Sequence, residues 1–491
     1  MGSTGRQAVY DAIIVGAGFG GIGMAITLRR KGIRRVLILE RGAQIGGCWA
    51  VNTYPGAACD VPSHLYSYSF APMADWSRKF APQPEILAYI QDCAKQFGVE
   101  GQVRLRQSVT SARFDSQRAR WTITTAAGEA LEAKVFIPST GQLSEPMWPR
   151  LEGEPFEGLT MHSAHWDHQH DLQGRRVAVI GTGASAIQFV PRIAGMVADL
   201  HVIQRSAPYV IDKRDGDYSP LQRKLFATVP GLLKAHRLAL FLQHEARFVA
   251  FARPGSFMKL FERQARQKRL NELKAKPLAV SMTPDYPMGC KRILISNDYY
   301  EAFNRPNVHL HHGVSVRTCA EGLEVEDASG SRLLDVDTLI FGTGFAATDF
   351  LSTIDISGAD GISLKSAWAE SASAYLGISV SGFPNMFIVY GPNTNLGHNS
   401  IISMLEAQFG YIAQAVELVV DGRVDQLDLK ADVQSSFDRD LQNKLQKTVW
   451  GAGCDSWYKT ASGRISTNWY GLVSSYRRLA RHFDLQNYHQ S

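Results

Sequence analysis

Two glycine-rich turns hold the residues of this chain best suited to binding dinucleotides. The first turn contains Gly16, Gly18 and Gly21, follows the apolar run 12–15 and leads into a helix-like stretch. In such a unit Gly16 permits a tight turn, Gly18 lets the backbone approach a pyrophosphate, and Gly21 allows close helix–strand packing. Because strand, turn, helix and a second apolar run occur in order, the pattern predicts a nucleotide site.

A second copy of the pattern begins about 165 residues later. The apolar run 177–180 leads into Gly181 and Gly183, with Ala186 at the third position, and the next apolar run is 200–203. Alanine is tolerated at the third position of this motif. The chain is therefore predicted to be α/β, with two Rossmann-like dinucleotide-binding domains.

The two turns differ in the charged residue that follows the second strand. Glu40 lies 24 residues after Gly16, and Arg205 lies 24 residues after Gly181. A carboxylate accepts hydrogen bonds from ribose hydroxyls, whereas a guanidinium suits a 2′-phosphate. We therefore expect FAD at the first site and NADP at the second, with Ser206 as an added donor. A solvated Arg205 without a ligand is the alternative.

Paired FAD and NADP sites imply electron flow from nicotinamide to flavin. A disulfide reductase would need a closely spaced cysteine pair behind the first turn, but Cys48 and Cys59 are eleven residues apart. We therefore expect O₂ rather than a disulfide to accept the electrons.

A further motif lies between the two glycine turns. Its residues Phe156, Gly158, His162, Trp166 and Asp167 follow the pattern F-x-G-x-x-x-H-x-x-x-W-[P/D]. The motif resembles the signature of the type I Baeyer–Villiger monooxygenases, a class of flavoprotein monooxygenases. A second match runs from residues 46–49 through 54–56 and Asp60 to Tyr66, and a third is 291–292 followed by 297–300. Residues 139–141 and 342–344 match the family's inter-domain linkers, and 391–400 and 455–458 resemble its 4-hydroxyacetophenone and aliphatic-ketone branch.

The resemblance implies an NADPH- and O₂-dependent enzyme that converts ketones into esters or lactones through a C4a-peroxyflavin. It places Arg292 beside the peroxide as a fixed positive charge that cannot titrate away. Asp60 would be the partner of Arg292, and Lys291 would reach toward the NADP phosphate beside Arg205. The alternatives are a surface arginine for Arg292 and a helix or turn cap for Asp60.

The family also assigns roles to aromatic and histidine residues away from Arg292. Trp49 and Tyr66 would border the cofactor, although Trp49 fits a plain core residue equally well. Trp457 matches a tryptophan on a mobile loop over nicotinamide and substrate. His162 would couple domain movement to catalysis, with a structural histidine as the rival interpretation. The spacing of nearby histidines at 165, 168 and 170 matches no metal motif, so no metal is expected.

Composition bounds the remaining expectations. The 491 residues are 45% hydrophobic and 20% charged, which are globular values. Six cysteines do not indicate a disulfide framework, and the start of the chain lacks the pattern of a signal peptide. We expect a soluble protein of the reducing cytoplasm. Its FAD domain is predicted at 1–141 and 345–491, and its NADP domain at 142–217 and 287–344.

Residues 218–286 break the α/β rhythm and are predicted to form a small helical insertion. The stretch 221–280 has 13 Lys/Arg against 3 Asp/Glu, whereas the rest of the chain has 39 against 43. The net charge of +6 therefore comes from the insertion and does not indicate nucleic acid binding. The insertion is either a core-facing amphipathic pair with a solvated basic face, a lid over substrate access, or a contact with anionic lipid.

Two other functions compete with ketone oxygenation. An N- or S-oxygenating flavin monooxygenase of the same fold would not need an anionic peroxide. A non-catalytic flavin-binding protein is the third, although intact motifs at both sites argue against it. The identity of the ketone, whether linear, cyclic or aryl, does not follow from the motifs.

Overall fold

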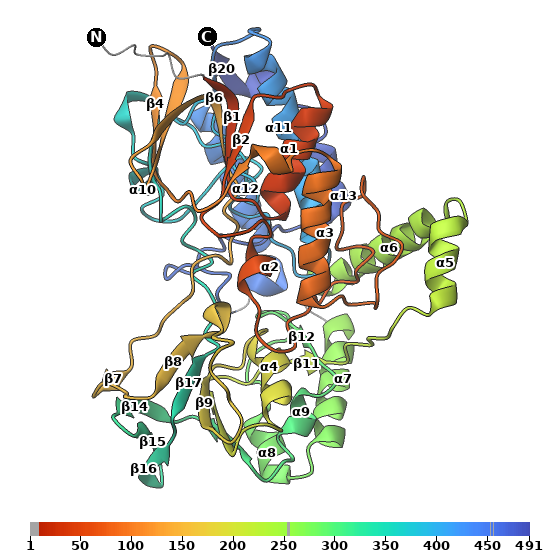
Figure 1. Cartoon of the computed structure of the whole chain (residues 1–491), viewed down its shortest axis with the longest axis vertical. Coiled ribbons are helices and arrows are strands. Elements are labelled where there is room, and N and C mark those ends of the chain that lie inside the picture. Colours follow the sequence, from red (N-terminus) through yellow and green to blue (C-terminus); the bar gives the residue numbers. More distant parts are fainter. Residues whose placement is uncertain (1–8, 253–255, 452, 455) are drawn as a thin grey trace.

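The computed structural model describes residues 9–252, 256–451, 453–454 and 456–491 of the chain. Two bodies, each built on its own β-sheet, lie one above the other in Figure 1, and the helical insertion lies along one side of both. The predicted α/β class with two Rossmann-like units and a helical insertion is confirmed. The predicted domain boundaries stay a prediction.

The first sheet has seven strands in the order β18-β4-β5-β6-β1-β2-β3. Its centre is parallel, because β1 (Tyr10–Val15) pairs with β2 (Val36–Leu39) on one side and β6 (Ala130–Pro138) on the other. These strands are buried, as expected for a sheet covered on both faces. The other members are β3 (Val103–Arg104), β4 (Val109–Asp115), β5 (Arg120–Thr125) and β18 (Asp355–Ser357).

Helices from both ends of the chain cover this sheet. The helix after the first glycine turn, α1 (Phe19–Arg30), packs against α11 (Ile401–Val420) and α3 (Gln83–Gln96). A Cβ on Gly23 would lie only 2.4 Å from Cε2 of Phe409 in α11, so the two helices approach closely. The remaining C-terminal elements are α10 (Leu364–Ala367), β19 (Leu427–Leu429), α12 (Ala431–Leu445), α13 (Val473–Leu479) and β20 (Tyr488–Gln490).

The second sheet is parallel throughout and has the order β13-β10-β9-β17-β8. Its strands are β8 (Leu159–His162), β9 (Arg176–Ile180), β10 (Asp199–Gln204), β13 (Val308–His312) and β17 (Thr338–Phe341). One face packs on α4 (Ala186–Ile193) and α9 (Tyr299–Ala302). A smaller sheet covers the other face with β7 (Glu152–Gly153), β14 (Ser315–Cys319), β15 (Gly322–Asp327) and β16 (Gly330–Asp335).

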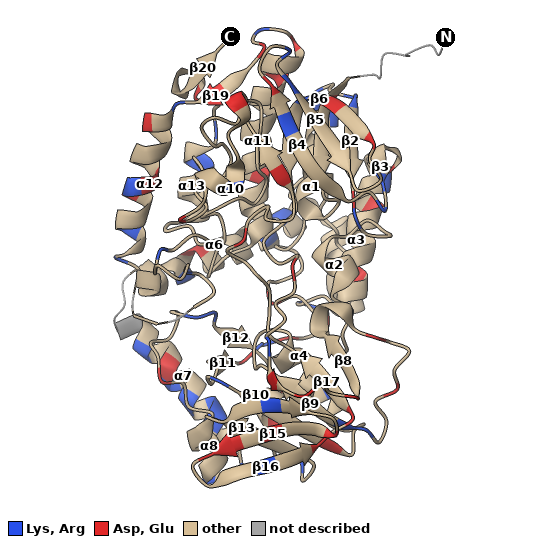
Figure 2. Cartoon of the chain, turned by 90° about the vertical axis from the view of Figure 1, so that its left-hand side faces the viewer, with Lys and Arg blue, Asp and Glu red and all other residues tan. Residues whose placement is uncertain are grey.

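The insertion contains α5 (Pro220–Thr228), α6 (Leu232–Ala252), α7 (Ser256–Glu272) and α8 (Lys276–Ser281). A short ladder of β11 (Val210–Ile211) and β12 (Leu294–Ile295) flanks it. Helix α5 and the start of α6 project from the body in Figure 1, and Figure 2 shows the basic residues of α7. The far end of α6 is anchored, because the buried Glu245 carboxylate accepts the backbone N–H groups of Val473 and Ser474 at 3.0 and 3.1 Å.

One cross-link differs from the sequence expectation. Cys290 and Cys454 form a disulfide although 164 residues separate them, while Cys48, Cys59, Cys93 and Cys319 are free. The pair could not be recognised from the sequence, because the spacing of two distant cysteines carries no information about their contact. No disulfide framework was expected, and this single bond is the exception among the described residues.

Candidate functional site

The three glycines of the first turn meet different constraints. A Cβ on Gly16, whose φ is +107°, would lie 2.4 Å from the Ser139 carbonyl oxygen, and one on Gly21 would lie 1.8 Å from the Gly16 oxygen. Gly18 has a negative φ, and its nearest neighbour would be Gly47 Cα at 3.4 Å, an ordinary contact. The fold itself therefore requires glycine at positions 16 and 21. A side chain would fit at position 18, where a bare backbone lets a pyrophosphate approach.

Glu40 lies at the end of β2 and faces the first turn. Its carboxylate accepts the backbone N–H of Ala17 and that of Gly42, each at 2.7 Å. Each carboxylate oxygen has further lone pairs, so Glu40 can still accept a ribose hydroxyl. The residue orders the turn as well as being suited to the ligand.

Trp49 and Tyr66 lie together behind the first turn. The indole Nε1 of Trp49 donates to the Tyr66 hydroxyl at 3.2 Å, and Tyr66 packs edge-on against Phe19. Trp49 lies on the short helix α2 (Cys48–Val51) and is only partly buried. The two predicted aromatic residues therefore form one unit at the edge of the hydrophobic core, and their contact with the cofactor stays a prediction.

The second turn repeats the division found in the first. A Cβ on Gly181, with φ of +109°, would lie 2.5 Å from the Gly342 carbonyl oxygen. A Cβ on Gly183 would find only that oxygen, at 3.8 Å. Ala186 is fully buried at the start of α4, where its side chain fits. A side chain would therefore fit at Gly183 as it does at Gly18, and the bare backbone at both positions lets a pyrophosphate approach.

A cluster of cations lies where β10 ends. Lys291 Nζ donates to the Ser206 hydroxyl at 3.1 Å and lies 4.5 Å from the centre of the Tyr286 ring. Arg205, next to Ser206 in the chain, is exposed. The structure therefore brings Lys291 to Ser206, the chain neighbour of Arg205, and a hydroxyl beside a cation suits a phosphate.

Arg292 and Asp60 form an ion pair between the two bodies of the structure. Their side chains are 38% and 29% exposed, so the pair is partly buried. The Asp60 carboxylate raises the pKa of the Arg292 guanidinium above its ordinary value, outweighing the opposing effect of burial. Arg292 therefore stays charged throughout any working pH range. The predicted pairing of the two residues is therefore present in the structure, and their catalytic roles stay a prediction.

Three further residues lie close enough to this pair to share its electrostatics. Tyr458 and Tyr390 also raise the pKa of Arg292. Burial lowers the pKa of Lys213, and Asp60 opposes this shift. Sequence reasoning missed all three as site residues. Tyr458 lies beside Trp457 in the matched stretch 455–458, whereas no local sequence pattern marks Lys213. Trp457 itself packs on Tyr458, with ring centres 4.4 Å apart.

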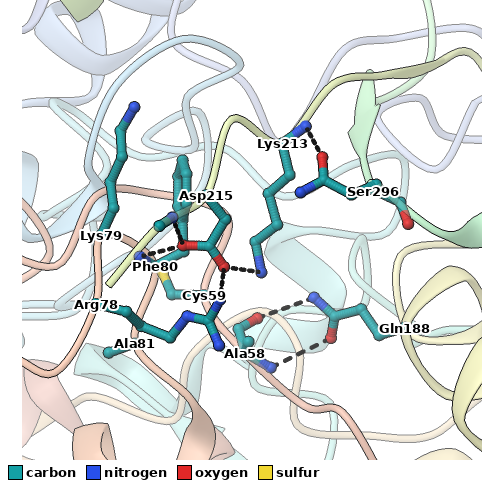
Figure 3. A network of polar contacts seen from close by, with 12 residues as sticks. Ala58, Cys59, Arg78, Lys79, Phe80, Ala81, Gln188, Lys213, Asp215 and Ser296 are labelled. Carbon is teal, nitrogen blue, oxygen red and sulfur yellow. Dashed lines mark hydrogen bonds and ion pairs between the residues drawn. The ribbon is translucent and has the colours of Figure 1, made fainter. Parts of the chain in front are cut away.

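The loop that holds Asp60 is fastened to the second body by the contacts in Figure 3. Gln188 of α4 accepts the Ala58 N–H at 3.4 Å and donates to the Ala58 carbonyl at 3.0 Å. The buried Asp215 carboxylate contacts Arg78 at 2.9 Å and Lys213 at 3.8 Å. These contacts on both sides of Asp60 keep its loop against the body that supplies Arg292.

His162 lies between the two chain segments that connect the bodies. Its ring packs against Trp148 and Phe345, with centres 5.3 and 5.9 Å apart, and its Nδ1 accepts the Ala164 N–H. The connecting segments run side by side, because Met147 N–H donates to the Gly344 carbonyl at 2.9 Å. Burial lowers the pKa of His162 to about 4, so the ring is neutral at pH 7.

The rest of the signature supports the same region. A Cβ on Gly158 would lie 2.3 Å from the Phe156 ring and 2.4 Å from the Asp337 carbonyl, so this position needs glycine. Trp166 packs on Phe189, and Asp167 accepts the Gln169 N–H at 2.9 Å. The signature residues thus build the junction of the bodies and do not touch Arg292 in any contact described.

The division among the glycines yields a test of ligand binding that separates folding from cofactor loss. We expect Gly18→Ala to fold with the melting temperature of the flavin-free wild type but to lose bound flavin, because the new methyl group fits the chain and blocks a pyrophosphate. Gly21→Ala should lower the melting temperature, since its Cβ would clash with the Gly16 carbonyl. Gly101→Ala, with open space around it, is the matched control. Equal flavin content in Gly18→Ala and the wild type would contradict the interpretation.

Comparison with known proteins agrees with this geometry. The family model described as pyridine nucleotide-disulphide oxidoreductase matches residues 13–230. A Baeyer–Villiger monooxygenase of Pseudomonas aeruginosa is 42% identical, over 97% of this chain and 90% of its own length. The solved cyclohexanone monooxygenase from Rhodococcus sp. Phi1 bound to NADP⁺ has a TM-score of 0.87 at 27% identity, with 97% of each chain covered.

A second solved structure, the OTEMO complex with FAD and NADP, has a TM-score of 0.86 at 26% identity and covers 99% of this chain and 100% of its own. The predicted pair of cofactors is therefore the pair found in that complex. The N- or S-oxygenating alternative is not favoured by these relatives. Near-complete coverage at this identity, together with the two glycine turns and the Arg292–Asp60 pair, shows that the chain belongs to the Baeyer–Villiger monooxygenases.

Proposed function

We propose that this chain uses NADPH and O₂ to insert an oxygen atom next to a ketone carbonyl, giving an ester or lactone. The observation that carries the proposal is the partly buried Arg292–Asp60 ion pair at the meeting of the two bodies. When bound, FAD would supply the electrons that activate O₂, and NADPH would supply the hydride.

The two turns would hold the two cofactors. The backbone at Gly18 and the Glu40 carboxylate suit the pyrophosphate and ribose of FAD, with Trp49 and Tyr66 beside them. Gly183 suits the pyrophosphate of NADP, and the cluster of Arg205, Ser206 and Lys291 suits its 2′-phosphate. The room beside Gly18 and Gly183 and the positive charges of Arg205 and Lys291 support this assignment.

Arg292 would stabilise negative charge that develops on oxygen during the reaction. A guanidinium fixed by Asp60 does not have to reorganise as that charge forms, and its raised pKa keeps it protonated. Asp60 would act as a positioning residue that limits the rotation of the guanidinium. The contact of His162 with both connecting segments supports its role in transmitting domain movement, and not proton transfer.

Replacement of Arg292 tests the proposed reaction. We expect Arg292→Ala to be reduced by NADPH at a near-normal rate yet to form ester at least about 100-fold more slowly, as for loss of one transition-state donor. Ester formation and NADPH oxidation would be measured over linear, cyclic and aryl ketones. Arg113→Ala, which removes an exposed ion pair with Asp355, is the control. Unchanged ester formation would refute the role of Arg292, and hydrogen peroxide as the sole product of the wild type would refute the reaction.

Replacement of Arg205 tests the cofactor assignment. We expect Arg205→Ala to raise the KM for NADPH at least about tenfold, equivalent to the loss of a charge-assisted hydrogen bond, and to leave the KM for NADH nearly unchanged. Steady-state rates with both nucleotides would measure the difference. Equal effects on the two KM values would contradict a contact with the 2′-phosphate.

We also propose that the insertion touches anionic lipid on the cytoplasmic side of a membrane. The outer stripe of α6 is apolar at helical spacing and exposed, with Leu238 and Leu242 each 56% and Val249 51% exposed. Leu221 and Leu225 extend it on the projecting α5. The other face of α6 is buried at Leu240, His244 and Phe251, as a core-facing amphipathic helix requires, and it is the outward-facing leucines that support the lipid contact.

The charge of the hairpin of α5 and α6 suits anionic headgroups. Lys224, Lys234 and Arg247 are exposed on these helices, whereas their one acid, Glu245, is buried. Among the described residues no single helix is long and apolar enough to cross a bilayer, and α5 and α6 together would meet that criterion only across a 107° bend. An interfacial contact fits this geometry better than a span.

Vesicle binding tests the lipid contact. We expect the wild type to sediment with vesicles that contain phosphatidylglycerol, and the double variant Leu238→Ser/Leu242→Ser to bind at least about tenfold more weakly, because two leucine side chains no longer leave water. Leu333→Ser, at a 51% exposed position on the remote β16, is the matched control. Absence of vesicle binding by the wild type, or self-association through the same face, would overturn the proposal.

A further inference from the structure

The disulfide between Cys290 and Cys454 lies at the proposed catalytic centre. Cys290 is fully buried and precedes Lys291 and Arg292 directly in the chain. Cys454 lies three residues before Trp457 and four before Tyr458. With Cα atoms 6.4 Å apart, the cross-link joins the segment that holds Arg292 to the segment that holds these two aromatic residues.

Independent contacts place the same two segments together. A Cβ on Gly289 would lie 3.3 Å from Val449, and the Tyr458 side chain acts on the pKa of Arg292. Tyr458 is buried, and its ring lies 6.4 Å from that of Trp450. The two segments that the cross-link joins therefore pack together beside Arg292.

The cross-link adds a restraint that the local hydrogen bonds do not provide. The Cys290 N–H donates to the Pro287 carbonyl at 3.2 Å, and the Lys459 N–H donates to the Ser456 carbonyl at 2.9 Å. Each of these bonds closes a turn within its own segment. The disulfide instead joins two segments whose separation of 164 residues would otherwise give them many relative arrangements.

We propose that Cys290 and Cys454 are positioning residues whose disulfide holds the Trp457–Tyr458 segment against Arg292, and that reduction of the bond releases this segment. Because Cys290 directly precedes Lys291, which contacts Ser206 at the proposed phosphate site, reduction also weakens NADP binding. The inference rests on the proposed role of Arg292. Oxidation proceeds by thiol–disulfide exchange with a low-molecular-weight disulfide: one S–S bond is exchanged for another, and two low-molecular-weight thiols are released. Reduction by a dithiol reverses this, placing two electrons and two protons on the cysteine pair.

Two of the other cysteines compete poorly for such exchange. Cys59 and Cys93 are buried, and burial raises the pKa of Cys93 to about 11, which leaves little thiolate at neutral pH. Cys290 is buried as well, so exchange begins at the partly exposed Cys454, and the exposed Cys48 is a competing thiol that peptide mapping must follow. Cys319 lies on β14, in the small sheet of the second body, and serves as a reference thiol. In a reducing cytoplasm the pair would be open, and under oxidising stress it would close.

The test compares the holoenzyme after treatment with glutathione disulfide and after treatment with dithiothreitol. Alkylation and peptide mapping of the oxidised protein should recover Cys290 linked to Cys454. Reduction should speed amide hydrogen exchange in peptides spanning residues 457–465 and raise the NADP⁺ dissociation constant, measured by calorimetry, at least about fivefold, the lower end of the usual range of coupling between sites. Reoxidation should restore both values.

Two variants complete the test. Cys454→Ser should match the reduced wild type and ignore the redox treatment, whereas Cys319→Ser should respond like the wild type. Two free thiols at positions 290 and 454 after oxidation, or identical exchange and NADP⁺ binding in both redox states, would overturn the proposal. Absence of ester formation in both states would count against the proposed function alone, because mapping, exchange and calorimetry do not depend on ketone oxidation.

Discussion

The ion pair between Arg292 and Asp60 is the interaction on which the arrangement of the site depends. It joins a loop that follows the first glycine turn to a segment of the second body, so its formation requires the two bodies to meet. Exposed ion pairs contribute less than about 1 kcal/mol, whereas loss of one partner of a buried pair costs about 3–5 kcal/mol. The free-energy contribution of a partly buried pair lies between these limits. Because that contribution is modest, the pair depends on the surrounding polar contacts to hold its two loops in place.

Those contacts explain why the Asp60 carboxylate stays paired with Arg292 where the two bodies meet. Gln188 fastens the chain two residues before Asp60, and Asp215 with Lys213 and Arg78 fastens the neighbouring strand-like segment. Lys213 also adds positive charge near Asp60. The site is therefore preorganised from both bodies, and a substitution at Gln188 or Asp215 would act on Arg292 without touching it.

The parts of this site that the sequence predicted are those set by local spacing. Glycine spacing identified both turns, because a tight turn between strand and helix has few solutions. Tyr390, Lys213 and the Cys290–Cys454 pair could not be found, since their proximity to Arg292 depends on how distant segments pack. The insertion shows the same limit: apolar periodicity predicted α6, but periodicity does not tell which side faces solvent, and Leu238 and Leu242 face outward.

Within one glycine motif, glycine is present for two different physical reasons. Gly16 and Gly21 are required by neighbouring backbone atoms that leave no room for a Cβ, so the chain itself determines them. Gly18 and Gly183 have that room, so the fold alone does not explain why they are glycine. Room for a side chain does not mark a site at an exposed glycine such as Gly101, but in a turn between a strand and a helix it leaves the backbone open to a pyrophosphate. Both turns contain such a residue at the same motif position, which is the structural reason to read two dinucleotide sites in this chain and not one.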